Sequence, residues 1–207
     1  LTSPINASII MTTNPILVLI AAAIILKQAI TTKKIIGIAL GISGASALIL
    51  FNSNLGRIDT NPFGDLLIFL NSTSYGIYLV LVAPLMSKYR PITVIKWVFL
   101  FGAIPVVGVG IGEFAAIRWS EFSLAVWLKA GFVVFFTTFI AYLFNVIGLK
   151  TLKPSTVSTY IYSQPVFAAL VAILLGKDEL SILKVIAALL IFSGVYLVSS
   201  RKKEAVD

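Results

Sequence analysis

The chain alternates long apolar runs with short connectors that hold turn-forming and charged residues. A helix needs about 20 predominantly apolar residues to cross a bilayer core of about 30 Å. Seven runs reach this length, and no connector is long enough to be a soluble domain. The pattern therefore predicts an all-α, polytopic membrane helical bundle. Its spanning helices are expected at residues 5–26, 34–52, 63–86, 92–112, 126–149, 155–175 and 182–200.

Composition agrees with a membrane protein. The chain has 207 residues, of which 59% are hydrophobic and 12% charged, and its mean hydropathy is +1.04. A soluble domain has about 25% charged residues and about 45–50% apolar ones. The formal charge of +8 would favour nucleic acid as the partner of a soluble protein, but here the basic residues lie in short loops between apolar runs. We therefore expect a lipid bilayer around the chain and no nucleic acid.

The sequence contains no cysteine and no histidine. This excludes disulfides, zinc sites built from Cys and His, and catalytic pairs that need either residue within this chain. The acidic residues are not clustered, so a membrane-embedded enzyme would lack an evident nucleophile, base or metal set. We expect no metal, no cofactor and no enzymatic activity.

Basic residues are divided unequally between the two sides of the predicted bundle. One side, which includes the C-terminal tail, holds eleven Lys and Arg residues, and the other holds five. By the positive-inside rule the richer side is cytoplasmic. We predict a multi-pass protein of the cell (inner) membrane with a cytoplasmic C-terminus. The eleven are Lys27, Lys33, Lys34, Lys88, Arg90, Lys96, Lys150, Lys153, Arg201, Lys202 and Lys203, and the five are Arg57, Arg118, Lys129, Lys177 and Lys184.

Two stretches of the chain correspond at an offset of 150 positions without a gap. The correspondence runs through two consecutive helices, and prolines, lysines and glycines carry it, so we interpret it as an internal repeat. A proline inside a helix removes one backbone donor and clashes with the preceding turn. Pro15 and Pro165 therefore predict a helix break in each copy. Matching pairs include Pro4 with Pro154, Ser8 with Ser158, Asn14 with Gln164, Pro15 with Pro165, Lys34 with Lys184, and Gly44 with Gly194.

The two copies are predicted to face opposite leaflets, because five spans separate equivalent helices. Inverted repeats with interrupted helices are typical of secondary transporters, whose sites lie near the midplane between the repeats. A period of five helices predicts a ten-helix protein, of which this chain would hold the last seven. On this basis residues 1–52 are the last two helices of the first repeat, residues 62–201 are the second repeat, and residues 202–207 are a cytoplasmic tail.

Four stretches resemble the EamA domain, the repeat unit of the drug/metabolite transporter superfamily. They are residues 5–50, 64–85, 139–155 and 155–200, of which the last shows the family's proline in the penultimate helix and its small–x–x–Gly ending near Gly194. The family's glycine–glutamate turn reads Leu26–Lys27–Gln28 in the first copy, whereas Gly176 is followed by Lys177–Asp178–Glu179 in the second. The resemblance implies ten helices as five plus five, cytoplasmic termini, and export or uptake of small metabolites such as amino acids.

Candidate solute-binding residues surround the paired prolines. Asn14 and Gln164 precede them, and a carboxamide can donate and accept hydrogen bonds at once. The alternative is that these amides clamp carbonyls freed by the kink or bond a neighbouring helix. Tyr160, which lies with Tyr162 and Ser163 just before Gln164, shares a helix face with that residue. Its alternative role is that of a tyrosine in the interfacial belt.

Two further polar groups occupy otherwise apolar spans, where polar side chains are costly without partners. They are Asn71, Tyr75 and Tyr78 in the third span, and Thr138, Tyr142 and Asn145 in the fifth. The alternative is ordinary packing, with Ser and Thr bonding back to helix carbonyls. No carboxylate lies in the middle of a predicted span. Gly37, Gly41 and Gly44 predict close helix packing.

Taken together, these patterns predict a metabolite transporter that works by alternating access. An uncharged polar lining would suit a small polar or amphipathic solute, for instance an amino acid. The alternatives are a non-transporting membrane scaffold or assembly protein, or an inactive fragment of a transporter. The expected partners are a small-molecule solute and the bilayer, and the sequence leaves a homodimer open.

Overall fold

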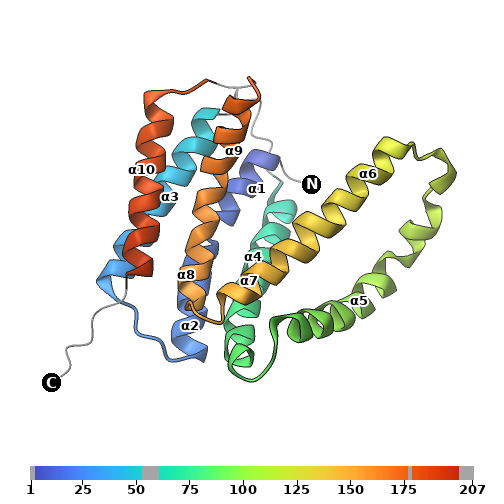
Figure 1. The fold of residues 1–207 in the computed structure, drawn as a ribbon, viewed down its shortest axis with the longest axis horizontal. Coiled ribbons are helices and arrows are strands. Elements are labelled where there is room, and N and C mark those ends of the chain that lie inside the picture. Colours follow the sequence, from blue (N-terminus) through green and yellow to red (C-terminus); the bar gives the residue numbers. More distant parts are fainter. Residues whose placement is uncertain (1–2, 53–60, 177–178, 201–207) are drawn as a thin grey trace. The chain divides into compact units, whose positions relative to one another are not determined.

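The computed structural model describes residues 3–52, 61–176 and 179–200. Within these ranges seven helical segments are long and apolar enough to cross a membrane, which confirms the predicted all-α polytopic bundle. The chain forms two units, residues 1–81 with 152–207 and residues 82–151 (Figure 1). Some of the basic residues that were counted to predict the topology lie outside the described residues, namely Arg57, Lys177 and residues 201–203. The predicted tail 202–207 also lies outside them.

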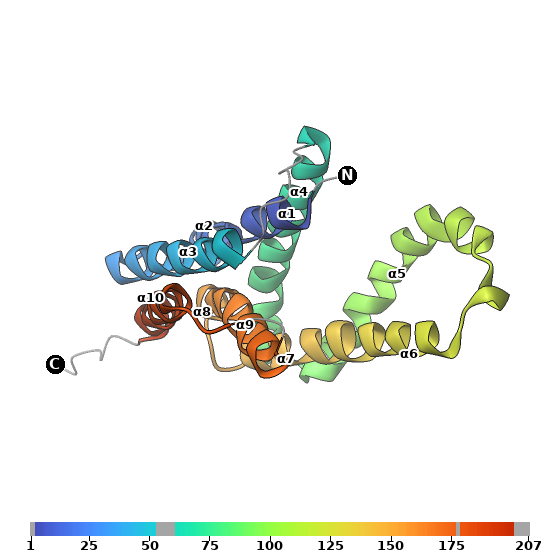
Figure 2. The same cartoon turned by 90° about the horizontal axis from the view of Figure 1, so that it is seen from above.

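The first unit contains both copies of the repeat. Its helices are α1 (Pro4–Met11), α2 (Asn14–Ile25), α3 (Thr32–Asn52), α4 (Pro62–Val82), α8 (Pro154–Thr159), η4 (Tyr160–Ser163), α9 (Gln164–Leu174) and α10 (Ile182–Ser199). α10 packs along α3 over most of its length, and α2 packs against α8 (Figures 1 and 2). Gly76 brings α4 against α2, since a Cβ at this position would lie 3.3 Å from Val18 Cγ2.

Both proline-containing spans are interrupted beside their prolines. In the first copy α1 ends at Met11 and α2 begins at Asn14. The Ile16 amide donates to the Thr13 carbonyl at 2.9 Å instead of to the Thr12 carbonyl one residue earlier. In the second copy the 3₁₀ segment η4 separates α8 from α9. Each break lies where a proline removes a backbone donor, so the local sequence accounts for its position.

α3 and α10 pack through glycines with reciprocal contacts. A Cβ on Gly37 would lie 2.7 Å from the Gly194 carbonyl oxygen, and one on Gly44 would lie 2.6 Å from the Ala187 carbonyl oxygen. The offset of 150 pairs Gly37 with Ala187 and Gly44 with Gly194, so each contact is the repeat equivalent of the other. The two helices are therefore antiparallel, and the predicted close packing of these glycines is confirmed.

The second unit is an antiparallel hairpin of long helices. It contains η1 (Ala83–Ser87), α5 (Pro91–Ala116), η2 (Trp119–Glu121), α6 (Leu124–Phe132), η3 (Val133–Ile140) and α7 (Ala141–Gly148). α5 packs against α7, where the rings of Phe99 and Tyr142 lie 5.6 Å apart. The span expected as one regular helix at 126–149 instead has a π-helical segment, η3. Within it the hydroxyls of Thr137 and Thr138 both donate to the Val133 carbonyl, at 2.7 and 3.2 Å. Such back-bonding accompanies a local change of helix pitch.

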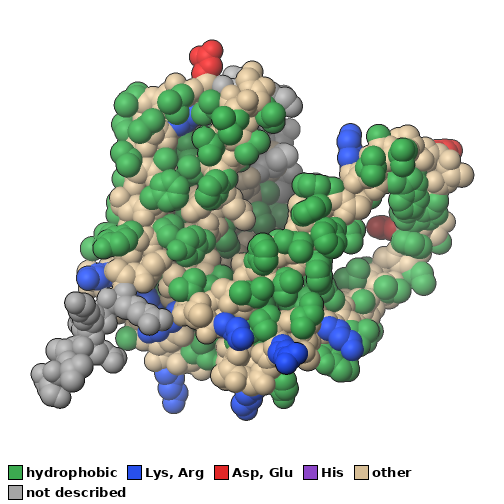
Figure 3. Space-filling model, in the orientation of Figure 1, with side chains coloured by type: hydrophobic (Ala, Val, Ile, Leu, Met, Phe, Trp, Pro, Cys, Tyr) green, Lys and Arg blue, Asp and Glu red, His purple; other side chains and the backbone are tan. Residues whose placement is uncertain are grey.

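Apolar side chains cover the outward faces of the first unit. Figure 3 shows them over the visible face of α9 and α10. On α10 the exposed large hydrophobic residues are Ile182, Val185, Ile186, Leu189, Phe192 and Tyr196. A soluble protein rarely presents a continuous apolar face of this kind, whereas a bilayer covers one at no cost.

The glycine contact between α3 and α10 gives a testable prediction. Gly44→Ala should lower the free energy of unfolding by about 1–3 kcal/mol, because its Cβ would overlap the Ala187 carbonyl and the Ile191 side chain. Gly110→Ala in α5 is the matched control, since no described atom lies within 4 Å of a Cβ at that position. The control should be neutral or stabilising by up to about 1 kcal/mol. Unfolding by SDS in mixed micelles measures both, and equal effects would contradict the close contact.

Candidate functional site

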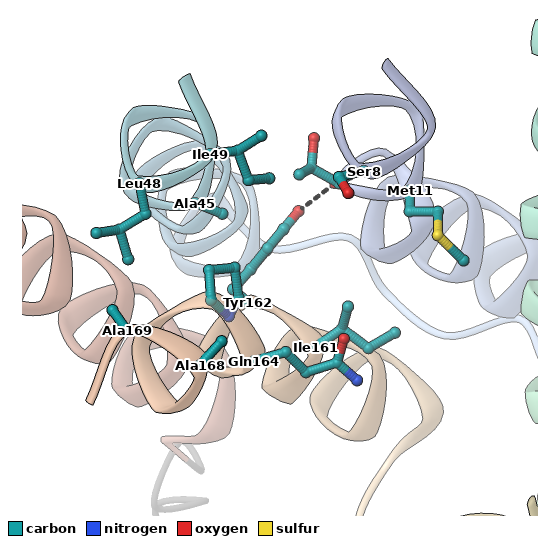
Figure 4. Close-up of a pocket in the computed structure, with 12 residues that line it drawn as sticks. Ser8, Met11, Ala45, Leu48, Ile49, Ile161, Tyr162, Gln164, Ala168 and Ala169 are labelled. Atoms are coloured by element: carbon teal, nitrogen blue, oxygen red, sulfur yellow. Dashed lines mark hydrogen bonds between the residues drawn. The ribbon is translucent and has the colours of Figure 1, made fainter. Parts of the chain in front are cut away.

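A cavity of about 430 Å³ lies in the first unit, where the two interrupted helices face each other (Figure 4). Small-molecule sites are clefts of about 300–1,000 Å³ with mostly apolar walls and a few polar groups. Residues of α1, α3, η4 and α9 surround this cavity, together with Thr12 at the break. The lining comprises Ser8, Met11, Thr12, Ala45, Leu48, Ile49, Ile161, Tyr162, Gln164, Pro165, Ala168 and Ala169.

Tyr162 joins the two breaks. Its side chain is 1% exposed, and its hydroxyl donates a hydrogen bond of 3.0 Å to the Thr12 carbonyl, drawn as a dashed line in Figure 4. That carbonyl is the one that the Ile16 amide no longer reaches, because Ile16 bonds Thr13 instead. The ring occupies the space that Gly41 leaves open, since a Cβ there would overlap it. The freed carbonyl is therefore satisfied by an aromatic hydroxyl from the other repeat copy.

The cavity wall provides hydrogen-bonding groups but no charged side chain among its lining residues. The Thr12 hydroxyl donates to the Ile9 carbonyl at 2.7 Å, and the Tyr162 hydroxyl is already bonded to Thr12. Gln164 is exposed and adds a carboxamide at the start of α9. Such a wall can hold an apolar group and orient one polar end of a small molecule.

The structure places the predicted residues near the breaks in different surroundings. Gln164 and Pro165 line the cavity. Asn14 is 4% exposed and lies outside the lining, and its side-chain oxygen has no hydrogen-bond partner within the described parts of the chain. Pro15 is fully buried beside it. Tyr160 is 50% exposed and is also outside the lining. Of this group, the structure brings only Gln164 and Pro165 to the cavity.

The predicted residues on α4 and in the second unit are not part of this cavity wall. Asn71 is exposed on α4, and the rings of Tyr75 and Tyr78 lie 6.0 Å apart on the same helix. In the second unit the Thr138 hydroxyl donates to the Val133 carbonyl at 3.2 Å. The Asn145 amide donates to the Ala141 carbonyl at 3.0 Å. Tyr142 is half-buried against Phe99. A role for these six residues in solute binding stays a prediction.

Several lining residues were not singled out by the prediction, and Tyr162, which lies beside the predicted Tyr160, is the most important of them. Tyr162 is the equivalent of Thr12 at the offset of 150, and these two residues make the contact between the breaks. Equivalent residues meet only where they lie close to the internal two-fold axis, and the sequence does not say which pair does. Met11 and Ile161, which both line the cavity, are another equivalent pair, so the repeat alone does not single out residues 12 and 162.

The sequence matches a known transporter family. The model described as the EamA-like transporter family matches residues 62–200. The chain is 29% identical over 200 residues to the uncharacterized transporter YyaM of Bacillus subtilis (strain 168), covering 96% of this chain and 65% of YyaM. It is 28% identical over 181 residues to the uncharacterized inner membrane transporter YedA of Escherichia coli (strain K12), covering 84% of this chain and 55% of YedA. The chain thus spans less than two thirds of the length of either relative.

A relative from an archaeon and a solved structure agree with this match. An uncharacterized transporter of Archaeoglobus fulgidus is 28% identical over 200 residues, covering 95% of this chain and 68% of the relative. One crystal structure aligns with a TM-score of 0.74 at 18% identity, covering 95% of this chain and 67% of the other. At that identity the likeness shows a shared fold.

The bond between the two breaks gives a testable prediction. Tyr162→Phe should lower the free energy of unfolding by about 1 kcal/mol, because the Thr12 carbonyl loses its donor in a buried place. Tyr160→Phe is the control, because it removes the same hydroxyl from a half-exposed ring two residues earlier in the chain. It should have no measurable effect on the free energy of unfolding. Unfolding by SDS in mixed micelles compares the two variants. Equal stabilities would mean that the hydroxyl is not needed at the break.

Proposed function

This chain belongs to the EamA-like transporter family, and from that premise we propose that it moves a small solute across the membrane by alternating access. The solute binds in the cavity beside Tyr162. The observation that supports this best is the position of the cavity at the two helix breaks, which the bond from Tyr162 to Thr12 joins. Transporters with inverted repeats bind their solutes at such discontinuous helices.

The side chains of the cavity wall indicate which class of solute the cavity can bind. Its apolar part consists of Met11, Leu48, Ile49 and Ile161 together with proline and alanines, and its polar part consists of hydroxyls and the Gln164 carboxamide. A fixed charge on the solute would find no opposite charge among the lining residues, and desolvating an unpaired charge is costly. We therefore propose a small amphipathic solute without net charge, and zwitterionic amino acids and their neutral derivatives are the first class to test.

The predicted topology assigns the cavity to one side of the membrane. With the C-terminus in the cytoplasm, α10 runs from the outer to the inner leaflet and the antiparallel α3 runs outward. Leu48 and Ile49 lie near the end of α3, so the cavity belongs to the outer half of the membrane. The proposed state is outward-facing, in the inner membrane.

Flux measurements on the whole protein in liposomes test this function. Leucine, N-acetyl-leucine, leucinamide and N-acetyl-leucinamide present one side chain in zwitterionic, anionic, cationic and neutral form. We expect saturable flux of at least one of them. Gln164→Leu should lower its kcat/KM about fivefold, since losing one hydrogen bond of about 1 kcal/mol corresponds to this factor.

Gln28→Leu is the control, because it removes a carboxamide in the turn after α2, outside the cavity lining. It should leave the flux unchanged. Flux that is equal in the wild type and in Gln164→Leu would reject the cavity as the site. No flux of any of the four solutes would favour a non-transporting scaffold.

A further inference from the structure

The polar and apolar groups of the cavity wall lie at different levels. Thr12, Tyr162 and Gln164 lie at the two helix breaks, and the side chain of Gln164 is exposed. Ala168 follows Gln164 by four residues of α9, which is about 6 Å along the helix axis. A solute whose polar end bonds the Gln164 carboxamide would therefore place its other end beside Ala168.

Two helices provide the apolar part of the wall beside Ala168. α9 contributes Ala168 and Ala169, and α3 contributes Ala45, Leu48 and Ile49. Figure 4 shows the two groups on opposite sides of the cavity. All five side chains are aliphatic and carry no polar atom, so this part of the cavity suits an apolar group of a solute.

The internal repeat shows which wall residues are unusually small. Ala168 is the equivalent of Val18, and Ala169 is the equivalent of Leu19. Val18 is 0% exposed and Leu19 is 6% exposed, so both are packed into the protein core. The alanines are two and three carbon atoms smaller than these equivalents, and the cavity lies beside them. Their small size therefore leaves room that a larger side chain would fill.

Two residues of the opposite wall are instead larger than their repeat equivalents. Leu48 corresponds to Val198, and Ile49 corresponds to Ser199. Leu48 is 3% exposed and packs in a buried cluster that includes Tyr162, so its position is fixed by the core. The room beside this wall thus depends on the alanines of α9.

The lining also favours one kind of apolar group. Tyr162 carries the one aromatic ring among the lining residues that the structure describes, and it is 1% exposed, so its faces are covered. Aromatic pairs gain affinity from the stacking or edge contact of two rings, and this wall offers no ring for that contact. A branched aliphatic group would instead supply the carbon atoms that the two alanines lack.

We propose that Ala168 and Ala169 determine the size of the solute, and that the cavity selects a molecule without net charge that carries a branched aliphatic side chain of leucine size. The polar end of this molecule bonds Gln164. The inference rests on the proposed function of the cavity as the solute site. The rival explanation is that the alanines serve helix packing alone and that the cavity does not discriminate solutes by size.

Binding measurements on the purified whole protein separate these explanations. The probes are leucine, alanine and phenylalanine, each as the free amino acid and as the N-acetyl amide. A solute that binds the folded protein raises its unfolding temperature with concentration, and this rise gives Kd. In the wild type the leucine probe should bind about tenfold more tightly than the alanine and phenylalanine probes, since a methylene in an apolar pocket is worth a factor of about ten or more.

Ala168→Leu fills the room beside Leu48 and tests the size limit. It should raise Kd for the leucine probe about tenfold and change Kd for the alanine probe by less than about twofold. Ala130→Leu is the matched control, because it makes the same change at an exposed position of α6 outside the cavity lining. It should leave both constants unchanged. If Ala168→Leu does not fold, Ala168→Val adds one carbon atom fewer and should shift the same ratio in the same direction.

Three results would overturn the size limit. They are equal shifts of the leucine and alanine constants in Ala168→Leu, phenylalanine binding as tightly as leucine in the wild type, and no binding of any probe.

The binding and flux results can fail separately. Size-dependent binding without flux in liposomes would support the role of the alanines and count against transport. Flux that falls in Gln164→Leu but is equal for leucine and alanine in both the wild type and Ala168→Leu would leave transport intact and reject the size limit.

Discussion

A single backbone carbonyl determines how this unit is built. The break at Asn14–Pro15 leaves the carbonyl of the buried residue Thr12 without its helical donor, so another group must supply one. The hydroxyl of Tyr162, which belongs to the other repeat copy, donates a hydrogen bond of 3.0 Å to this carbonyl. Gly41 makes the bond geometrically feasible, because any side chain there would occupy the space of the ring. A proline, a tyrosine and a glycine from three separate helical segments thus depend on one another, and of the three the tyrosine lines the cavity.

The sequence predicted the scaffold well and the site only in part. Spans, breaks and glycine packing follow from local chemistry, namely apolar length, a missing amide at Pro15 and Pro165, and the small size of Gly44. The role of Tyr162 depends on which carbonyl lies opposite its hydroxyl, and that requires the fold. Its neighbour Tyr160, with the same side chain, is half-exposed. Helix periodicity places the two tyrosines on different faces, but it favours Tyr160, which shares a face with Gln164, and the 3₁₀ segment η4 contains both residues.

Asn14 and Gln164 show a second limit of sequence reasoning. They are chemically alike and occupy equivalent positions, yet one is buried and the other is exposed at the cavity. Their surroundings differ because α2 lies against α8 while α9 stands apart from α1. A repeat identifies equivalent residues, but it does not say which copy has which conformation.

If a transporter exchanges the conformations of its two repeat copies, divergence between the copies makes its two states unequal in energy. If the copies were identical, exchanging their conformations would leave the free energy unchanged, and both states would be equally populated. Here Ala169 in the cavity wall corresponds to Leu19, which is buried in a cluster with Ile38 and Val198. Burying the larger side chains is worth more per residue than burying alanines. Under the proposed alternating access, the packing of Leu19 with Val198 would favour the conformation described here, and a solute would supply the differential binding energy that populates the other.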